Sequence, residues 1–192
     1  MVFAPGNYND GMAAATGITI DEFELLPGAL ARNHELVDGE LVDVSGNNPL
    51  HNSLRDVLIV LLLPYVREKK LGKIIAEQEY DFEGNAHGPD VSFIPDAKLH
   101  LVDRRRRVQR FVPDLVIEIV SENDSFKKLM EKAARYRACG TKEVWIFEQN
   151  TRRTFVLTED REALLSDKDI FESKRIPGFS IRLGELYDRA AE

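Results

Sequence analysis

The stretch PDLVIEIVS, residues 113–121, decides the fold, because its pattern is typical of a strand in the middle of a sheet. Its apolar residues leave neither strand face polar: Leu115, Val116, Ile117, Ile119 and Val120. Such strands are expected where a sheet is covered on both faces. Glu118 interrupts the run, and an unpaired buried carboxylate costs at least about 2 to 7 kcal/mol before its charge is counted. The sequence therefore predicts that Glu118 has a partner or opens onto a site.

Length and composition predict one globular domain. The chain has 192 residues, of which 43% are hydrophobic and 31% charged, as in ordinary soluble proteins. A net charge of −7 argues against a protein that coats nucleic acid non-specifically, but it leaves room for a local basic cleft. The single cysteine, Cys139, cannot form an internal disulfide, which fits a reducing cytosol. We therefore expect a cytoplasmic protein.

The N-terminal segment indicates where the domain begins, and the most apolar run indicates whether the chain spans a membrane. Residues 1–17 lack the basic start and continuous apolar stretch of a signal peptide, so we expect a mobile N-terminal arm and a single domain at 18–192. The run VLIVLLLPYV, residues 57–66, is shorter than the ~20 residues that a membrane helix needs. It predicts a core helix and no membrane span.

The remaining pattern predicts an α/β (α+β) fold, a mixed sheet flanked by helices. Residues 34–44 predict a β-hairpin that turns at Asp38 and Gly39. A long helix should begin at Asn48 and Pro49, and Pro64 should bend or weaken its last turn. Further elements are expected as a short helix near 19–28, strands at 73–82, 90–95, 143–148 and 154–159, a helix from Asp124 to about Cys139, and a tail at 176–187 that folds back on the domain.

Two Pro-Asp pairs open strands and offer candidate partners for Glu118. Asp114 lies on the same strand face as Glu118, four residues earlier. At about 3.3 Å per residue the two are ~13 Å apart, too far for one ion to contact both. If the strand at 90–95 lies beside the Glu118 strand, Asp90 and Glu118 could approach across the ladder, where facing Cβ atoms are about 5 Å apart. The sequence thus favours Asp90 and Glu118 as a pair that could hold a hard cation.

A series of motifs carries a family resemblance. In order they are HELVDGEL, PLHNSL, GPDVSFIP, PDLVIEIVSENDS, KAARYRACGTKEVWIFE and IPGFSIRL. Their order and spacing resemble those of the Uma2 family, endonucleases of the PD-(D/E)XK superfamily, over roughly residues 18–185. The resemblance implies a restriction-endonuclease-like core that hydrolyses phosphodiester bonds of nucleic acid, DNA in the first place, with Mg²⁺ or Mn²⁺.

The resemblance also implies site residues. Asp90 matches the superfamily's first aspartate and Glu118 its second acidic residue, so these two would hold the metal, with the Ile119 carbonyl as a further ligand. The usual lysine position, two residues after the acid, is Val120 here. Lys132 in the following helix matches a lysine of Uma2-like sequences instead. The resemblance therefore implies the catalytic residues Asp90, Glu118 and Lys132, with the Lys132 amine within hydrogen-bond or one-water reach of a carboxylate.

Glu35 and His51 resemble further family positions and are candidate supporting residues. Glu35 could supply a third carboxylate or orient a water, and His51 could contact phosphate or hold a neighbouring carboxylate. Ordinary alternatives remain open: Glu118 in a structural ion pair, Glu35 exposed on a hairpin, His51 as a polar helix-start residue, and Lys132 solvated on a helix flank. Lys127 and Lys128 are the rival lysines, and we expect Lys128 to be more exposed than Lys132.

Two hypotheses about function remain open: a metal-dependent nuclease, and an inactive nuclease-fold protein that binds nucleic acid or protein. The run RRRRVQR, residues 104–110, either contacts phosphate or forms a solvated loop, and the loop is the commoner case.

Zinc-ligand spacing, a phosphate-binding glycine loop and a Gly-x-Ser-x-Gly elbow are absent from the sequence. A homodimer is plausible because a duplex has two strands to cut.

Overall fold

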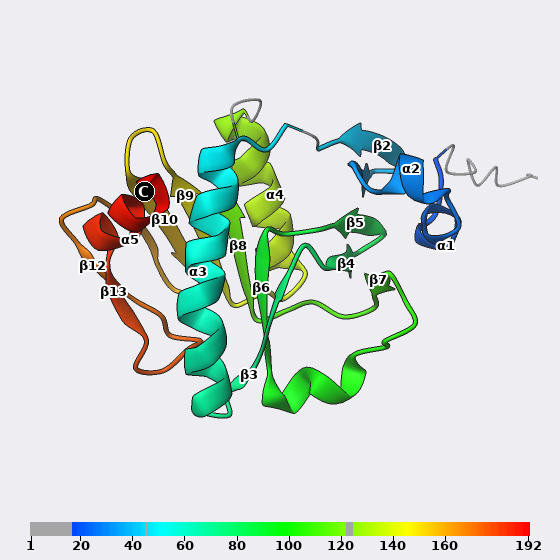
Figure 1. Ribbon diagram of the computed structural model, residues 1–192. Helices are drawn as coiled ribbons and strands as arrows, with labels where there is room; N and C mark the ends of the chain where they lie inside the picture. Colours follow the sequence, from blue (N-terminus) through cyan, green and yellow to red (C-terminus); the bar gives the residue numbers. More distant parts are fainter. Residues whose placement is uncertain (1–16, 45, 122–124) are drawn as a thin grey trace, which may run out of the picture.

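The computed structural model describes residues 17–44, 46–121 and 125–192 (Figure 1). The predicted mobile arm lies outside the described residues except for Gly17. Within them, the larger sheet has six strands in the order β11 (Glu162–Leu165), β10 (Arg153–Thr158), β9 (Glu143–Glu148), β8 (Leu115–Ile119), β6 (Val91–Pro95) and β3 (Gly72–Ala76). A second sheet has five strands in the order β2 (Glu40–Asp43), β1 (His34–Val37), β5 (Asn85–His87), β4 (Glu79–Phe82) and β7 (Val108–Gln109).

The helices cover both faces of the larger sheet and flank the smaller one. Figure 1 shows the long α3 on one side of β8 and β6, with α4 on the other. The described helices are α1 (Ile20–Glu24), α2 (Gly28–Ala31), α3 (Pro49–Glu68), α4 (Phe126–Ala138), α5 (Leu183–Ala191) and the 3₁₀ helix η1 (Asp96–Leu101). A small third sheet pairs β12 (Ile170–Glu172) with β13 (Ser180–Arg182). Among the described helices, none is long and apolar enough to cross a membrane.

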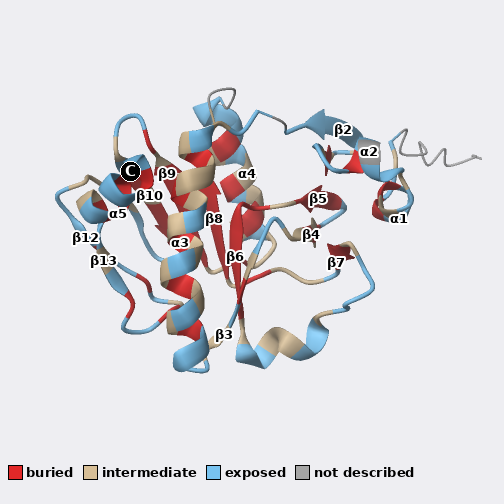
Figure 2. Ribbon diagram, in the orientation of Figure 1, coloured by how far each residue is buried: buried red, intermediate tan, exposed pale blue. Residues whose placement is uncertain are grey.

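The predicted central strand is β8, and all five of its residues are buried (Figure 2). It pairs antiparallel with β6 and parallel with β9, so the sheet is mixed as expected. Successive side chains of a strand face opposite sides. One face of β8 packs in the same core as α3, through Leu115, Ile117 and Ile119. Val116 packs with Leu129 and Ala133 of α4 on the other face, and the alternation turns Glu118 toward α4 as well.

Local signals explain where α3 and α4 begin. Asn48 caps α3 by accepting a 2.9 Å hydrogen bond from the main-chain N–H of His51. The helix includes Pro64 and continues to Glu68. The side chain of Ser125 caps α4, whereas the predicted cap, Asp124, lies outside the described residues. The predicted end of α4 is confirmed, because Cys139 is its C-cap and Gly140 follows with φ 106°.

The prediction of a single strand at 73–82 is wrong. The chain forms β3 and β4 instead, and these belong to different sheets. Glu77 has φ 51° between them, a left-handed conformation that ends the extended segment without a glycine or proline. After β4, Glu83 and Gly84 also have positive φ and turn the chain into β5, a strand that the sequence pattern did not indicate. This second turn is what places His87 beside the hairpin.

The C-terminal tail folds back on the domain, as expected. β13 pairs with β12, and α5 packs against α3. The buried face of α5 joins the same core as α3, through Leu183, Leu186, Tyr187 and Ala190. The tail therefore completes the cover over one face of the larger sheet.

Candidate active site

The strand register brings the two predicted acids together. In the antiparallel β6–β8 ladder Val91 pairs with Ile117, so the next step of the same register sets Asp90 opposite Glu118. Both residues are buried, with 9% exposure at Asp90 and 6% at Glu118. By contrast, Asp114 lies at the other end of β8 and forms a 2.6 Å ion pair with Lys98. The structure thus separates Asp114 from the site, as the strand spacing predicted.

Asp90 is held by two partners. Its Oδ2 accepts a 2.7 Å hydrogen bond from the main-chain N–H of Ile119, and its Oδ1 lies 3.3 Å from His51 Nε2. His51 is buried in the first turn of α3. Burial lowers the pKa of His51, but the hydrogen bond and charge of Asp90 outweigh it and leave that pKa raised. Of the two expected roles for His51, the structure shows contact with a neighbouring carboxylate.

Glu118 has two partners on α4. Its Oε1 accepts a 2.6 Å hydrogen bond from the Tyr136 hydroxyl and lies 3.1 Å from Lys132 Nζ. Burial is the largest influence on its carboxyl and raises the pKa of Glu118 to about 7. Lys132 acts against this rise, and the nearby Asp90 and Glu35 carboxylates add to it. The first alternative foreseen for Glu118 is confirmed, because it has partners; that it opens onto a site stays a prediction.

Lys132 lies where the resemblance implied. Its ammonium is 2.9 Å from Glu35 Oε1 and 3.1 Å from Glu118 Oε1, and its side chain is 19% exposed. Burial lowers the pKa of Lys132, but the two carboxylates outweigh it and leave that pKa raised. Lys127 is 86% exposed and pairs with Glu131 instead. The solvated-lysine alternative for Lys132 is wrong, although its catalytic role stays a prediction.

Glu35 is buried rather than exposed on the hairpin, because β1 pairs with β5 as well as with β2. Its Oε1 accepts a 3.0 Å hydrogen bond from the Gly88 N–H, and its Oε2 lies 2.8 Å from His87 Nδ1. Burial raises the pKa of Glu35, but the Lys132 ammonium and His87 outweigh it and bring that pKa to about 2. Glu35 is therefore an ionised anchor for Lys132.

His87 and Tyr136 contact this cluster but were not among the predicted site residues. His87 is 3% exposed and Tyr136 fully buried. The position of His87 three residues before Asp90, in the segment HGPD, is a sequence signal that could have drawn attention to it. Tyr136 lies four residues after Lys132 in α4, so the two side chains lie on neighbouring parts of the helix surface. Its hydroxyl is satisfied by Glu118, as expected for a buried tyrosine.

The donor set fits a hard cation with an incomplete protein shell. Asp90 and Glu118 supply two carboxylates, and Mg²⁺ is commonly bound by one or two carboxylates while it keeps several waters. Among the described residues, no group of three or more histidine, cysteine or acidic side chains is arranged to hold a metal ion. Glu35 is a poorer third ligand, because three donors contact its two oxygens, whereas Asp90 and Glu118 each have two. The proposed Ile119 carbonyl ligand stays a prediction.

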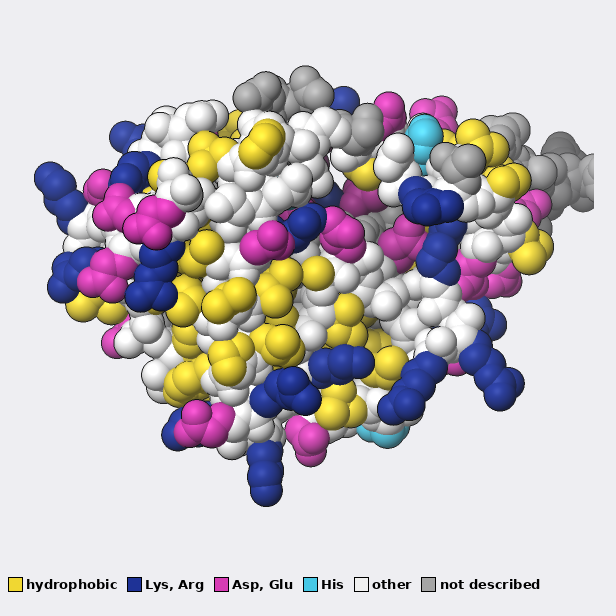
Figure 3. Space-filling view, in the orientation of Figure 1, with side chains coloured by type: hydrophobic (Ala, Val, Ile, Leu, Met, Phe, Trp, Pro, Cys, Tyr) yellow, Lys and Arg dark blue, Asp and Glu magenta, His cyan; other side chains and the backbone are white. Residues whose placement is uncertain are grey.

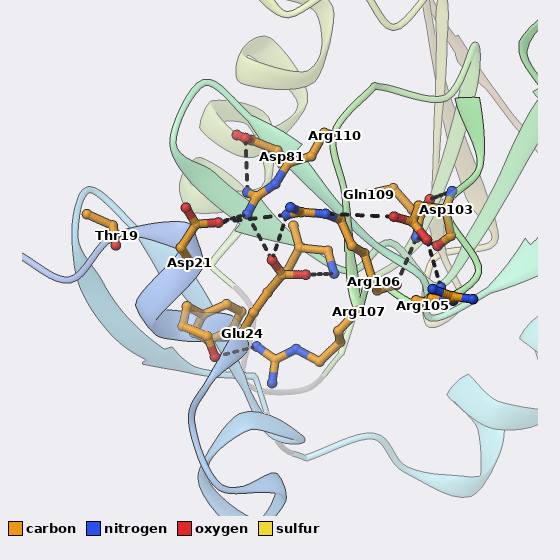
Figure 4. A network of polar contacts seen from close by, with 12 residues as sticks. Thr19, Asp21, Glu24, Asp81, Asp103, Arg105, Arg106, Arg107, Gln109 and Arg110 are labelled. Atoms are coloured by element: carbon orange, nitrogen blue, oxygen red, sulfur yellow. Dashed lines mark hydrogen bonds and ion pairs between the residues drawn. The ribbon is translucent and has the colours of Figure 1, made fainter. Parts of the chain in front are cut away.

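The arginine run 104–110 contacts other parts of the same chain (Figure 4). Glu24 of α1 lies 3.1 Å from Arg106 and 2.8 Å from Arg110. Arg107 pairs with Glu79 at 2.7 Å, and its guanidinium lies over the Phe23 ring. These three arginines tie α1 to the smaller sheet, and the run departs from a plain loop at Val108 and Gln109, which are buried in β7. Arg104, Arg105, Arg106 and Arg110 are exposed, as the solvated alternative expects. Contact of the run with phosphate stays a prediction.

The surface near the smaller sheet carries both signs of charge. In Figure 3, acidic side chains gather between α3 and the part that carries β1 and β2. Lysine and arginine side chains lie next to them on the same face. A mixed surface of this kind can present basic groups to phosphates around an acidic centre.

Comparisons with known proteins agree with this architecture. The family model "Uma2: Putative restriction endonuclease" matches residues 20–184. A similar solved structure is the crystal structure of "a putative nuclease belonging to DUF820" from Anabaena variabilis, with 17% sequence identity and a TM-score of 0.80. The match covers 90% of this chain and 99% of that chain. None of the curated proteins matches the sequence. The predicted nuclease-like α/β fold is therefore confirmed.

Proposed function

Because the chain belongs to the Uma2 family, we propose that it is a divalent-metal-dependent endonuclease that hydrolyses phosphodiester bonds of DNA. The observation that carries the proposal is the position of the Lys132 ammonium, 3.1 Å from a Glu118 carboxylate that faces Asp90 across the ladder. A buried acid pair beside a fixed ammonium is an arrangement that can bind a cation and stabilise negative charge on a phosphate.

Asp90 and Glu118 would hold Mg²⁺ or Mn²⁺. When bound, such an ion polarises a phosphoryl oxygen and lowers the pKa of a coordinated water. His51 and the Ile119 N–H hold the Asp90 carboxylate in a fixed orientation before a metal binds. This preorganisation means that Asp90 need not rotate into place when the site is used.

Lys132 would act on the attacking water and on the developing charge. An ammonium has three donors, and the two carboxylates at 2.9 and 3.1 Å account for two of them. The third can donate to a water or to a phosphate oxygen. When Glu118 binds the metal, Glu35 would keep the ammonium in place, because Glu35 has its own contact with Lys132.

A second candidate is an inactive nuclease-fold protein that binds nucleic acid or protein. It is favoured by one observation, that the buried Glu118 carboxylate has the Lys132 ammonium as a compensating partner, as in a structural ion pair. The two candidates differ in one measurable property, DNA cleavage. An inactive protein should not cleave DNA, and its Glu118→Ala variant should behave as wild type.

The test is a cleavage assay on supercoiled plasmid, single-stranded DNA and RNA, each with Mg²⁺, Mn²⁺ or EDTA. We expect metal-dependent cleavage of DNA that Glu118→Ala and Lys132→Ala abolish. Glu131→Ala and Lys128→Ala are matched controls, because both residues are exposed on α4. Cleavage that survives Glu118→Ala undiminished would refute the proposal, and cleavage of RNA alone would correct the substrate.

A homodimer and a cytoplasmic location stay predictions. Two copies would offer two sites for the two strands of a duplex. Light scattering on the purified chain, with and without a short duplex, measures the oligomeric state directly.

A further inference from the structure

The segment from His87 to Asp90 joins the two sheets at the candidate site. His87 ends β5 in the smaller sheet, and Asp90 directly precedes β6 in the larger one. His87 contacts Glu35, whereas Asp90 is one of the two proposed metal ligands. This short connection therefore carries contacts to both halves of the site.

Glu35 is fixed from three directions. Lys132 Nζ lies 2.9 Å from its Oε1, and the Gly88 N–H donates to the same oxygen at 3.0 Å. His87 Nδ1 lies 2.8 Å from the other oxygen, Oε2. A carboxylate rotates about its last side-chain bonds unless both oxygens are engaged, so the His87 contact at Oε2 acts together with the Gly88 N–H at Oε1 to set the direction in which Oε1 points.

His87 is suited to this task by its surroundings. Its ring is 3% exposed and lies against the rings of Phe82 and Tyr136, with centroids 5.8 and 5.6 Å away. An ionised carboxylate only accepts hydrogen bonds, so Nδ1 must carry the hydrogen that is donated to Glu35. The Phe82 and Tyr136 rings also contact each other, with centroids 4.4 Å apart, so they form one aromatic surface against the His87 ring and restrict its rotation from that side.

We propose that His87 is a positioning residue whose Nδ1–H orients Glu35, and that Glu35 in turn holds the Lys132 ammonium beside Glu118. The contacts run in sequence at 2.8, 2.9 and 3.1 Å. A lysine side chain is a flexible four-carbon stem, so one carboxylate alone leaves its ammonium several alternative positions. The catalytic consequence rests on the proposed function, whereas the positioning itself can be measured without it.

The kinetic test compares three substitutions. His87→Leu removes the donor, whereas His87→Asn keeps an N–H at the δ position. His100→Asn is the control, because His100 is an exposed histidine of η1. Loss of a residue that orients a metal ligand typically costs about 10- to 100-fold in activity, and we take the same range for a residue that orients the Glu35–Lys132 pair. We expect His87→Leu to lower kcat by about 10- to 100-fold with little change in KM. His87→Asn should recover most of this loss, and His100→Asn should behave as wild type.

A double-substitution cycle separates positioning from general damage. If His87 acts through Glu35, adding His87→Leu to Glu35→Gln should cause little further loss of kcat. If the two losses multiply, His87 acts independently of Glu35 and the proposal is overturned. Urea unfolding of each variant checks that it is folded, and His87→Phe, which also lacks a donor but keeps an aromatic ring, replaces His87→Leu if the latter is not.

Crystal structures of the metal-free variants decide the positioning even if the chain cleaves nothing. In His87→Leu the Lys132 amine should leave hydrogen-bond reach of Glu35, and in His87→Asn it should stay. A Lys132 amine that keeps both carboxylate contacts in His87→Leu overturns the proposal. An inactive wild-type chain would refute the proposed nuclease function alone, because this structural result does not depend on cleavage.

Discussion

Tyr136 donates a 2.6 Å hydrogen bond to the same Glu118 oxygen that lies 3.1 Å from Lys132 Nζ. One α4 face thus supplies both a neutral and a charged donor to a single buried carboxylate. Hydrogen bonds to the ionised form favour it and oppose the effect of burial. The two donors therefore keep Glu118 closer to ionisation than burial alone would allow.

Tyr136→Phe should destabilise the protein more at pH 8 than at pH 5. The change removes a hydrogen bond to a group that is ionised above a pKa of about 7 and protonated below it. A hydrogen bond to a charged group contributes about 1.5 to 3 kcal/mol, and one to a neutral group about 1 kcal/mol. Urea unfolding at both pH values measures the difference, and an equal loss at both would contradict the expected role.

Glu118→Gln should raise the free energy of unfolding at pH 8. The pKa of Glu118 is raised from 4.5 to about 7, so its favourable contribution is present below pH 4.5 and lost as pH rises through 7. Above that range the buried carboxylate costs free energy, on the order of 1 to 3 kcal/mol. Lys132 keeps its contact with Glu35 in the variant.

Urea unfolding at pH 5 and pH 8 measures the effect of Glu118→Gln, and Glu131→Gln on the exposed side of α4 is the matched control. A Glu118→Gln variant less stable than wild type at pH 8 would show that the ion pair with Lys132 outweighs the cost of burial.

Glu35→Gln should remove part of the acid sensitivity of the protein. The pKa of Glu35 is lowered from 4.5 to about 2, so its contribution is present above pH 4.5 and lost as pH falls through 2. A shift of this size corresponds to about 3 kcal/mol at neutral pH. Unfolding of wild type and variant between pH 2 and pH 7 should give curves that converge in acid. Parallel curves would mean that folding does not shift the pKa of Glu35.

Mn²⁺ should bind the wild-type chain and stabilise it. A ligand at 100 times its Kd raises the free energy of unfolding by about 2.7 kcal/mol when it binds only the folded state. Calorimetry and thermal unfolding with Mn²⁺ and Mg²⁺ measure both effects. Asp90→Ala should abolish them, whereas Asp96→Ala, at the start of η1, should not. Unchanged binding by Asp90→Ala would place the metal elsewhere.

Short-range patterns predicted much of the fold, because they report local physical chemistry. The hairpin turn at Asp38 and Gly39, the Asn48 cap and the buried strand around Glu118 all depend on neighbours in the sequence. The break between β3 and β4 was missed because Glu77 adopts a left-handed conformation that its residue type does not announce.

The site was only partly predictable for the same reason. The face of Glu118 and its approach to Asp90 follow from strand alternation and register. His87 was missed because its partner, Glu35, is 52 residues away on another strand. Lys132 was indicated by the resemblance and by its position on the helix relative to Lys128, but helical periodicity alone does not show which strand a helix residue reaches.

Lys132 supplies its ammonium from a helix, α4, and not from the Glu118 strand, and this affects how the sequence of such a site can evolve. Position 120 follows Glu118 by two residues, so alternation turns Val120 toward the same side, where it packs in the core beneath α4. A lysine there would enter the region that the Lys132 amine now occupies. The same positive charge can therefore be supplied from a strand or from a helix without moving the acids. A lineage could carry both lysines for a time and lose either one, so the linear motif can disappear while the chemistry persists.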